Sequence, residues 1–334
     1  STQGRAFWVV DDISPLRQYM PEHETAAAHL YDPSKAYRLT PTKGRNGGGE
    51  SFAPSAPNGA VLYYALADEV DLEEQGLKIE ILDGSGNVIR TLKSDKEKGV
   101  EGGGANASVA IPAETGINRF TWDLRRDPMT SVDYGFLFGA ARNDDAIQGY
   151  TVAPGNYGVL LTYGDVVQKS TVEVQWDPIN TYDDQAIQAQ QQFLSNTFSM
   201  LDAIYKRVES LQKIQKQVDL RKSIAKDMDD EALAERADAL LEKLKYWQES
   251  VTTPNRGNGQ DVLNIEPKLD AFLTILYGEG NSAVLGITQG QWDRLGDLEP
   301  GWNAAMQSWD TLVDTDVAEY SRSAGPAVVV PAWD

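Results

Sequence analysis

The amino-acid sequence predicts an α+β protein of more than one domain, in which a β-rich part is followed by a helical part. The chain has 334 residues, which suggests about two domains, and its 41% of hydrophobic residues can form buried cores. Short segments that alternate apolar and polar residues fill positions 60–178. Longer segments with helical spacing of apolar residues fill positions 179–320.

The N-terminal part is expected to be a strand followed by a connection. Residues 1–20 contain an apolar run, 6–10, that predicts a strand, and an acidic pair followed by Pro15 ends it. Because natural chains rarely open inside a strand, we interpret this start as the product of a cut. Residues 21–59 are rich in glycine and proline, so we expect a linker with short extended pieces.

Residues 60–178 have the pattern of an antiparallel β-sandwich of immunoglobulin or fibronectin type. Positions 77–82 alternate apolar and polar side chains, and the turn residues at 83–87 lead into a second strand at 88–92. Further strands are expected at 61–66, 117–124, 156–163 and 167–174. About seven short strands joined by regular turns are typical of such a sandwich.

Residues 179–320 are expected to form an α-helical bundle. Apolar residues recur every seven positions in two companion seams, at Ile187, Leu194, Leu201 and Val208 and at Ile204, Leu211 and Val218. Comparable spacing follows within 233–251, 265–276 and 292–313. Helical hairpins packed side by side would bury these faces. Residues 321–334 form a C-terminal tail, in which the apolar run 327–331 predicts a terminal strand or a docking segment.

Several residues indicate where these helices begin and end. Asp183 and Asp229 precede helical segments and are expected to be N-caps. Thr288 and Gln291 have the spacing of a capping box. Pro300 lies inside the last helical pattern, so we expect it to break or kink that helix.

Composition excludes several classes of function. The formal net charge of −20 repels nucleic-acid phosphates and anionic membranes, so we expect no nucleic-acid partner. The absence of cysteine excludes disulfides, thiolate metal sites and cysteine nucleophiles. No run approaches the roughly 20 apolar residues that span a bilayer. Two histidines leave little for a zinc site or a catalytic triad, and we assign no catalytic, cofactor or metal-binding residue.

Two acidic motifs have competing interpretations. Asp11 and Asp12 could act as paired carboxylates, but neighbouring strand residues point to opposite faces, which favours a turn-capping role. Residues 83–87 are similar to the start of a calcium loop. However, position 94 is Ser where the loop needs a bidentate Glu, which favours a hairpin turn.

Histidine and aromatic residues are also weighed against structural roles. His23 and His29 are six residues apart, which fits neither a helical metal pair nor a zinc finger, so we expect exposed loop residues. Trp122 is expected in the core. Tyr157 follows Pro154 and Gly155 in the manner of a tyrosine corner, which is a structural feature.

Three tryptophans of the last helical segment are candidate binding aromatics. Trp292, Trp302 and Trp309 could form a platform for a sugar or a protein partner. Their helical spacing instead favours a buried seam, and we prefer that interpretation.

One segment carries a resemblance to a known family. Residues 4–17, Gly-Arg-Ala-Phe-Trp-Val-Val-Asp-Asp-Ile-Ser-Pro-Leu-Arg, resemble the closing strand of the last blade in bacterial sortilin/VPS10-like, BNR-repeat β-propeller proteins, many of which carry a glycosyl hydrolase label. The similarity continues at 118–125, 152–157, 261–264, 276–278 and 327–331. It implies an exported, extracytoplasmic protein (periplasmic, cell-surface or secreted) whose propeller and any catalytic residues lie upstream.

These observations lead to two functional hypotheses. The first is a non-catalytic binding or assembly module that braces an upstream propeller domain or docks onto another protein subunit. The alternative is an accessory part of a glycoside hydrolase that contributes carbohydrate contacts. Such a role requires a cleft lined by aromatic residues and two carboxyl groups about 5–10 Å apart.

Overall fold

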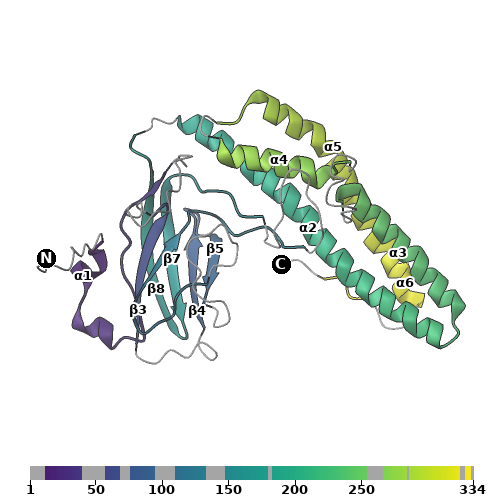
Figure 1. The fold of residues 1–334 in the computed structure, drawn as a ribbon, viewed down its shortest axis with the longest axis horizontal. Coiled ribbons are helices and arrows are strands. Elements are labelled where there is room, and N and C mark those ends of the chain that lie inside the picture. Colours follow the sequence, from purple (N-terminus) through teal and green to yellow (C-terminus); the bar gives the residue numbers. More distant parts are fainter. Residues whose placement is uncertain are drawn as a thin grey trace, which may run out of the picture. The chain divides into compact units, whose positions relative to one another are not determined.

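The computed structural model of the chain has a mixed α+β fold (Figure 1). It describes residues 12–39, 57–67, 76–94, 110–132, 147–179, 183–253, 266–283, 286–323 and 328–331. The chain forms two compact units, which we call the sheet unit (1–127 and 148–182) and the helical unit (128–147 and 183–334). The described residues 128–132 and 147 belong to the helical unit, although they lie within the range 60–178 that the sequence assigns to the sandwich.

The sheet unit contains two β-sheets. Its strands are β1 (Ala28–Leu30), β2 (Ala36–Arg38), β3 (Ala60–Leu66), β4 (Leu77–Leu82), β5 (Val88–Lys93), β6 (Gly116–Trp122), β7 (Gly155–Tyr163) and β8 (Val166–Trp176). One sheet has the order β1-β3-β6 and the other β2-β8-β7-β4-β5. The expectation of purely antiparallel pairing is wrong at one edge, where β2 runs parallel to β8 with Ala36 opposite Val174. Periodicity within a segment carries no information about so distant a partner.

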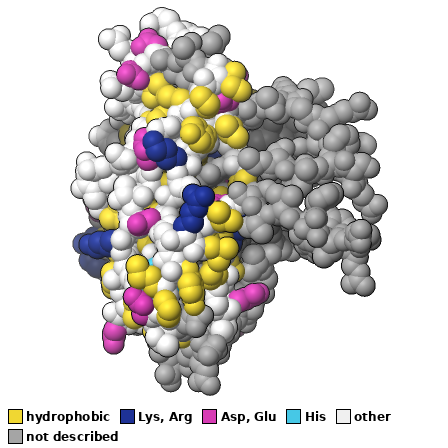
Figure 2. All heavy atoms as spheres, turned by 90° about the vertical axis from the view of Figure 1, so that its left-hand side faces the viewer, with side chains coloured by type: hydrophobic (Ala, Val, Ile, Leu, Met, Phe, Trp, Pro, Cys, Tyr) yellow, Lys and Arg dark blue, Asp and Glu magenta, His cyan; other side chains and the backbone are white. Residues whose placement is uncertain are grey.

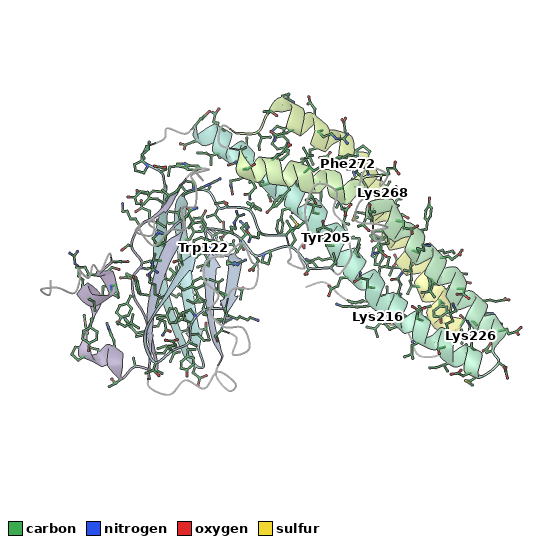
Figure 3. The ribbon with its side chains drawn as sticks, viewed as in Figure 1. Trp122, Tyr205, Lys216, Lys226, Lys268 and Phe272 are labelled. Atoms are coloured by element: carbon green, nitrogen blue, oxygen red, sulfur yellow. The ribbon has the colours of Figure 1, made fainter. Side chains whose placement is uncertain are left out.

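The inner faces of both sheets share one apolar core. Along β4 the burial alternates, so that Leu77, Ile79 and Ile81 point inward, as a strand with one solvated face requires. Trp122 on β6 and Leu161 on β7 belong to the same cluster, and Trp122 is labelled in Figure 3. The core therefore joins strands that are far apart in the sequence.

The segment 21–39 contributes to both sheets, although we expected a linker over 21–59. It contains a 3₁₀ helix, η1 (Pro21–Glu24), and then β1 and β2, which belong to different sheets. Three-residue strands give too short an alternation to be recognised from sequence. Before them lies the short helix α1 (Ser14–Gln18), where the Asp12 carboxylate accepts a hydrogen bond from the Ser14 backbone N–H at 2.9 Å. The turn-capping interpretation is thereby confirmed for Asp12, whereas the expected strand at 6–10 and Asp11 lie outside the described residues.

The helical unit is built on one long helix, α2 (Asp184–Asp227). This 44-residue helix contains neither glycine nor proline and is about 66 Å long at 1.5 Å per residue. Asp183 is its N-cap, as predicted, and accepts a hydrogen bond from the Gln185 backbone N–H at 3.0 Å. The predicted seams are buried along most of its length, at Leu194, Leu201, Ile204, Val208, Leu211 and Val218.

The remaining helices are α3 (Glu231–Val251), α4 (Leu269–Ser282), α5 (Gln289–Thr311), the π-helix η3 (Leu312–Val317) and α6 (Ala318–Ser323). The N-cap of α3 is Asp230 and not Asp229, which adopts a left-handed turn conformation with φ of 54°. Thr288 and Gln291 form the predicted capping box at the start of α5. Of the two expected effects of Pro300, the break is wrong, because α5 continues past it. The helical ladder loses the one hydrogen bond that proline cannot donate.

Close contacts fix the other elements to α2. Gly280 of α4 lies so near α2 that a Cβ there would be 3.0 Å from the Phe193 ring. The Gln190 amide donates to the Gly280 carbonyl at 2.9 Å and so satisfies the end of α4. The tail docks on the same helix, because Gln217 exchanges two hydrogen bonds with the Val329 backbone at 2.9 and 3.0 Å. Within the described segments, no helix has both the length and the apolar character for crossing a bilayer.

The burial of β7 yields a test of the sheet unit. Leu161 is fully buried, so Leu161→Ala should lower the free energy of unfolding by about 2–5 kcal/mol through lost burial and a residual cavity. Val167 on β8 is 56% exposed, and Val167→Ala should change it by less than about 0.5 kcal/mol. Urea denaturation followed by circular dichroism measures both. Equal losses in the two variants would contradict the assignment of β7 to the core.

Candidate docking groove on the helical unit

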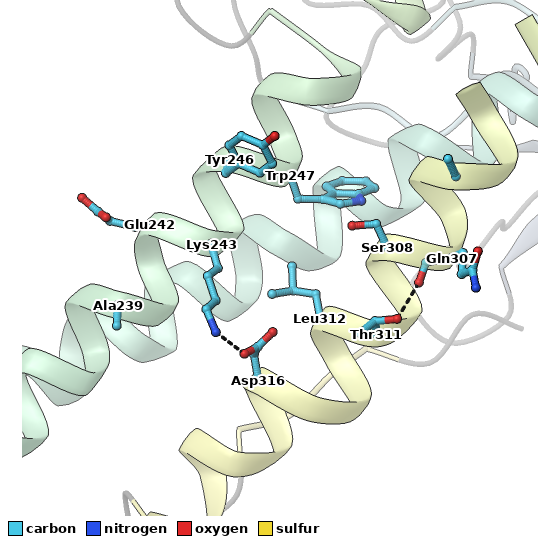
Figure 4. Close-up of a pocket in the computed structure, with 11 residues that line it drawn as sticks. Ala239, Glu242, Lys243, Tyr246, Trp247, Gln307, Ser308, Thr311, Leu312 and Asp316 are labelled. Carbon is cyan, nitrogen blue, oxygen red and sulfur yellow. Dashed lines mark hydrogen bonds and ion pairs between the residues drawn. The ribbon is translucent and has the colours of Figure 1, made fainter. Parts of the chain in front are cut away.

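A groove runs between α3 and the α5–η3 segment of the helical unit (Figure 4). Its main hollow has a volume of about 780 Å³. A second hollow of about 350 Å³ shares Ala239, Lys243 and Asp316 with the first and reaches α6 at Tyr320. We call the two together the α3–α5 groove. It extends along α3 from Arg236 to Trp247.

Small side chains line the groove on both sides. They are Ala239 on α3 and Ala304 and Ser308 on α5. The floor is apolar and consists of Trp247, which is 3% exposed, and the buried Leu312. The indole N–H of Trp247 donates to the backbone carbonyl of α5 residue Ala305 at 2.9 Å, which fixes the ring between the two helices.

The rim combines an exposed aromatic ring with charged groups. Tyr246 is 78% exposed on α3 at the edge of the groove. Lys243 of α3 forms an ion pair with Asp316 of η3, drawn as a dashed line in Figure 4. Because the side chain of Lys243 is largely exposed, this pair contributes little to stability and can be replaced by another cation.

The lining of the groove carries charges of both signs. Its acidic residues are Glu242, Asp316 and Glu319, and its basic residues are Arg236 and Lys243. Asp316 is the acidic residue that the α5–η3 segment contributes to this lining. The small excess of carboxylates gives a modest preference for a cationic ligand over an anionic one.

The three candidate tryptophans are placed in three different helix contacts. Trp292 packs edge-on against Phe193, with ring centroids 5.1 Å apart. The indole N–H of Trp302 donates to the Met200 carbonyl at 3.0 Å. Trp309 is buried, and its ring centroid lies 4.7 Å from that of Trp247. Each of the three rings is thus used in a different helix contact. The sequence did not indicate the groove residues Tyr246 and Trp247, because Trp247 fits the pattern of a buried helical seam.

The two histidines are brought together, which corrects the expectation of exposed loop residues. His23 lies on η1 and His29 on β1, both half-buried, and their rings stack with centroids 3.5 Å apart at 14°. Tyr31 packs edge-on against His29 at 4.7 Å. The pKa of His29 lies below its usual value. Burial of the ring is the main cause, and the neighbouring His23 lowers the pKa further, whereas the Asp32 carboxylate raises it. The backbone N–H of Met20 donates to Nδ1 of His23 at 3.3 Å.

Other singled-out residues have the structural roles that we expected. The Asp83 carboxylate accepts hydrogen bonds from the backbone N–H groups of Ser85 and Asn87, which confirms a hairpin turn. Trp122 is buried. The Tyr157 hydroxyl donates to the Ala153 carbonyl at 2.6 Å, and burial raises the pKa of Tyr157 to about 12. Within the described residues, no three histidine, aspartate or glutamate side chains are grouped to hold a metal ion.

A second surface with apolar character lies on the sheet unit. Figure 2 shows apolar side chains spread over this face with charged groups between them. Four of the exposed apolar residues fall within a short segment at and around α1, namely Ile13, Leu16, Tyr19 and Met20. Unlike the groove, this surface has no described hollow that would position a ligand.

The histidine stack predicts a pH dependence of stability. Because the folded state lowers the pKa of His29, the unfolded chain binds the proton more readily. The stabilisation is complete above about pH 6.5 and is lost as the pH falls through that value towards the folded-state pKa. Urea midpoints between about pH 5.5 and 8 should therefore fall more steeply for the natural chain than for His29→Gln. Parallel curves for the two proteins would contradict this role of the stack.

The groove geometry predicts different effects at neighbouring positions of α3. Trp247→Ala removes the floor and one hydrogen bond, and should lower the free energy of unfolding by about 3–5 kcal/mol. Tyr246→Ala removes an exposed ring and should change it by less than about 0.5 kcal/mol. Chemical denaturation distinguishes the two. A large loss for Tyr246→Ala would mean that this ring is buried and unavailable to a ligand.

Comparisons with known proteins leave the identity open. No family model and no curated protein matches the chain. Among solved structures, a chain described as pT26-6p is similar with 12% sequence identity, over 80% of this chain and 46% of its own length. This chain therefore aligns with less than half of pT26-6p. The TM-score is 0.17, a value that carries no argument about fold or function.

Proposed function

We propose that this chain is a non-catalytic docking module whose α3–α5 groove binds a basic, amphipathic helical segment of a protein partner. The observation that carries the proposal is the combination of an apolar, aromatic groove with a carboxylate, Asp316, that is held at the rim by an ion pair with the exposed Lys243. Trp247 and Leu312 provide an apolar floor, and Tyr246 stands exposed beside it. An amphipathic helix that lays its apolar face into such a groove is a common mode of peptide recognition.

The chemistry of the groove favours this class of ligand. Tyrosine and tryptophan supply much of the binding energy in many interfaces, and here Tyr246 is the exposed ring that a ligand can cover. The lining carboxylates of Glu242, Asp316 and Glu319 attract lysine and arginine on the flanks of the ligand helix. An incoming cation can also replace Lys243 at Asp316.

We further propose that the chain serves this role within an exported, sortilin-like propeller protein, where it braces the propeller or docks a subunit. The support is the resemblance of residues 4–17 and of the weaker motifs that follow. We also propose an immunoglobulin or fibronectin type for the sheet unit, supported by the Tyr157–Ala153 hydrogen bond. A carbohydrate-binding role has less support, because Trp292, Trp302 and Trp309 are engaged in helix packing.

A pair of synthetic peptides tests the docking role. The first is a lysine–leucine peptide of about 15 residues with apolar residues on one helical face, and the second replaces every lysine with glutamate. Titration calorimetry should detect binding of the lysine peptide alone. Tyr246→Ala should weaken it about 30-fold, as expected for a loss of about 2 kcal/mol at an aromatic anchor.

Met228→Ala is the matched control, since Met228 is equally exposed on the same unit but lies outside the groove. It should leave the affinity for the lysine peptide unchanged. If the glutamate peptide binds as well as the lysine peptide, or if Tyr246→Ala has no effect, the groove is not the docking site.

A further inference from the structure

One ion pair lies where the two hollows of the α3–α5 groove meet. Lys243 on α3 and Asp316 on η3 stand on opposite walls, and Figure 4 shows the lysine reaching across to the carboxylate. Both residues line the main hollow and also the second one. Other charged residues of the lining, such as Glu242 and Glu319, belong to one hollow each. The pair therefore crosses the groove at the junction of the hollows, and we call it the Lys243–Asp316 bridge.

Each hollow offers an apolar contact of its own beside the bridge. Trp247 forms the floor of the main hollow, and Leu240 lines the second one. These two residues are seven positions apart on α3, which is about 10.5 Å along the helix axis, and Lys243 lies between them. A ligand helix that runs along α3 matches this spacing with two apolar residues seven positions apart, since such residues lie on one face of a helix.

The two ends of the bridge differ in their exposure to solvent. The side chain of Lys243 is 58% exposed, whereas that of Asp316 is 24% exposed. A ligand that fills both hollows has to displace the ammonium group of Lys243, which can return to water at little cost.

The Asp316 carboxylate, in contrast, stays half-buried when the bridge opens. Covered by a ligand and left without its counter-ion, it loses both water and its partner, and this raises the free energy of the complex. A ligand that brings a cation of its own to this point restores the pair. A ligand with an uncharged residue at the same point does not.

We propose that Asp316 determines the specificity of the groove by selecting a lysine or arginine that lies between two apolar residues of the ligand helix. Lys243 holds this position until the ligand arrives and is therefore an internal competitor of the partner. This inference rests on the docking function proposed for the groove and deepens it. The ligand helix then carries an apolar residue, a basic residue three or four positions later, and a second apolar residue seven positions after the first.

Two peptides of identical composition test this selection. Both are lysine–leucine helices of about 15 residues with leucine at the fourth and eleventh positions of the peptide. The first has lysine at the eighth position, between the leucines. The second exchanges that lysine with an alanine at the sixth position, on the opposite face. Titration calorimetry with the full chain should show that the first peptide binds about 10-fold more tightly, as expected for one hydrogen-bonded ion pair. Because the two peptides have equal charge, the net charge of the chain cannot produce this difference.

Three variants assign the effect to the bridge. Asp316→Asn keeps the size of the side chain and should remove the difference between the peptides. Lys243→Met removes the internal competitor and should tighten binding of the first peptide about fivefold. Lys245→Met is the matched control, since Lys245 is similarly exposed on α3 and paired with Glu249, but lies outside the groove. It should leave both affinities unchanged. Urea denaturation checks that each variant is folded.

Three outcomes would overturn the selection by Asp316. They are equal binding of the two peptides by the natural chain, a difference that persists in Asp316→Asn, and a Lys243→Met variant that binds the first peptide no more tightly. If the natural chain binds both peptides equally and Tyr246→Ala weakens both, the groove remains a docking site without this specificity. If neither peptide binds to the natural chain or to Lys243→Met, the docking function is rejected as well.

Discussion

Burial of the apolar seams of α2 is the constraint on which the helical unit depends. A helix of 44 residues gains little from intrinsic propensity alone and is held in place by tertiary packing. The structure supplies that packing in sections, with α4 over the first part of α2 and α3 over the second. Trp302 of α5 joins at the Met200 carbonyl, and the tail joins at Gln217. One continuous helix thereby sets the positions of all the others.

The groove follows from this arrangement. Both α3 and α5 contact α2, and small residues such as Ala239 and Ser308 line the space between them. The wider π-helical turns of η3 then place Leu312 at the floor and Asp316 beside Lys243. Such local widening of a helix often marks a functional site. Side-chain size and helix geometry together leave a groove in an otherwise packed bundle.

Much of the fold was accessible from sequence, because its signals are local. Leu77, Ile79 and Ile81 alternate with other residues along the chain, which predicts the strand β4. Thr288 and Gln291 have the spacing of a capping box, which predicts the start of α5. The strand β1 has only three residues, which is too short for its alternation to be recognised in the sequence. The parallel pairing of β2 depends on β8, which lies much later in the chain. The groove was not predictable for the same reason. Its walls come from separate helices, and in sequence Trp247 is simply one more residue of a buried seam.

The three passages of the chain between units have a consequence for synthesis on the ribosome. Residues 128–132 emerge before α2, yet Met129 is buried within the helical unit and the Thr130 N–H donates to Asp202 at 2.7 Å. The sheet unit in turn awaits β7 and β8, which emerge after that excursion. Domains usually complete folding in N-to-C order during translation. Here the sheet unit is complete at residue 182, before α2 begins, whereas residues 128–132 must wait for α2 before they can be buried in the helical unit.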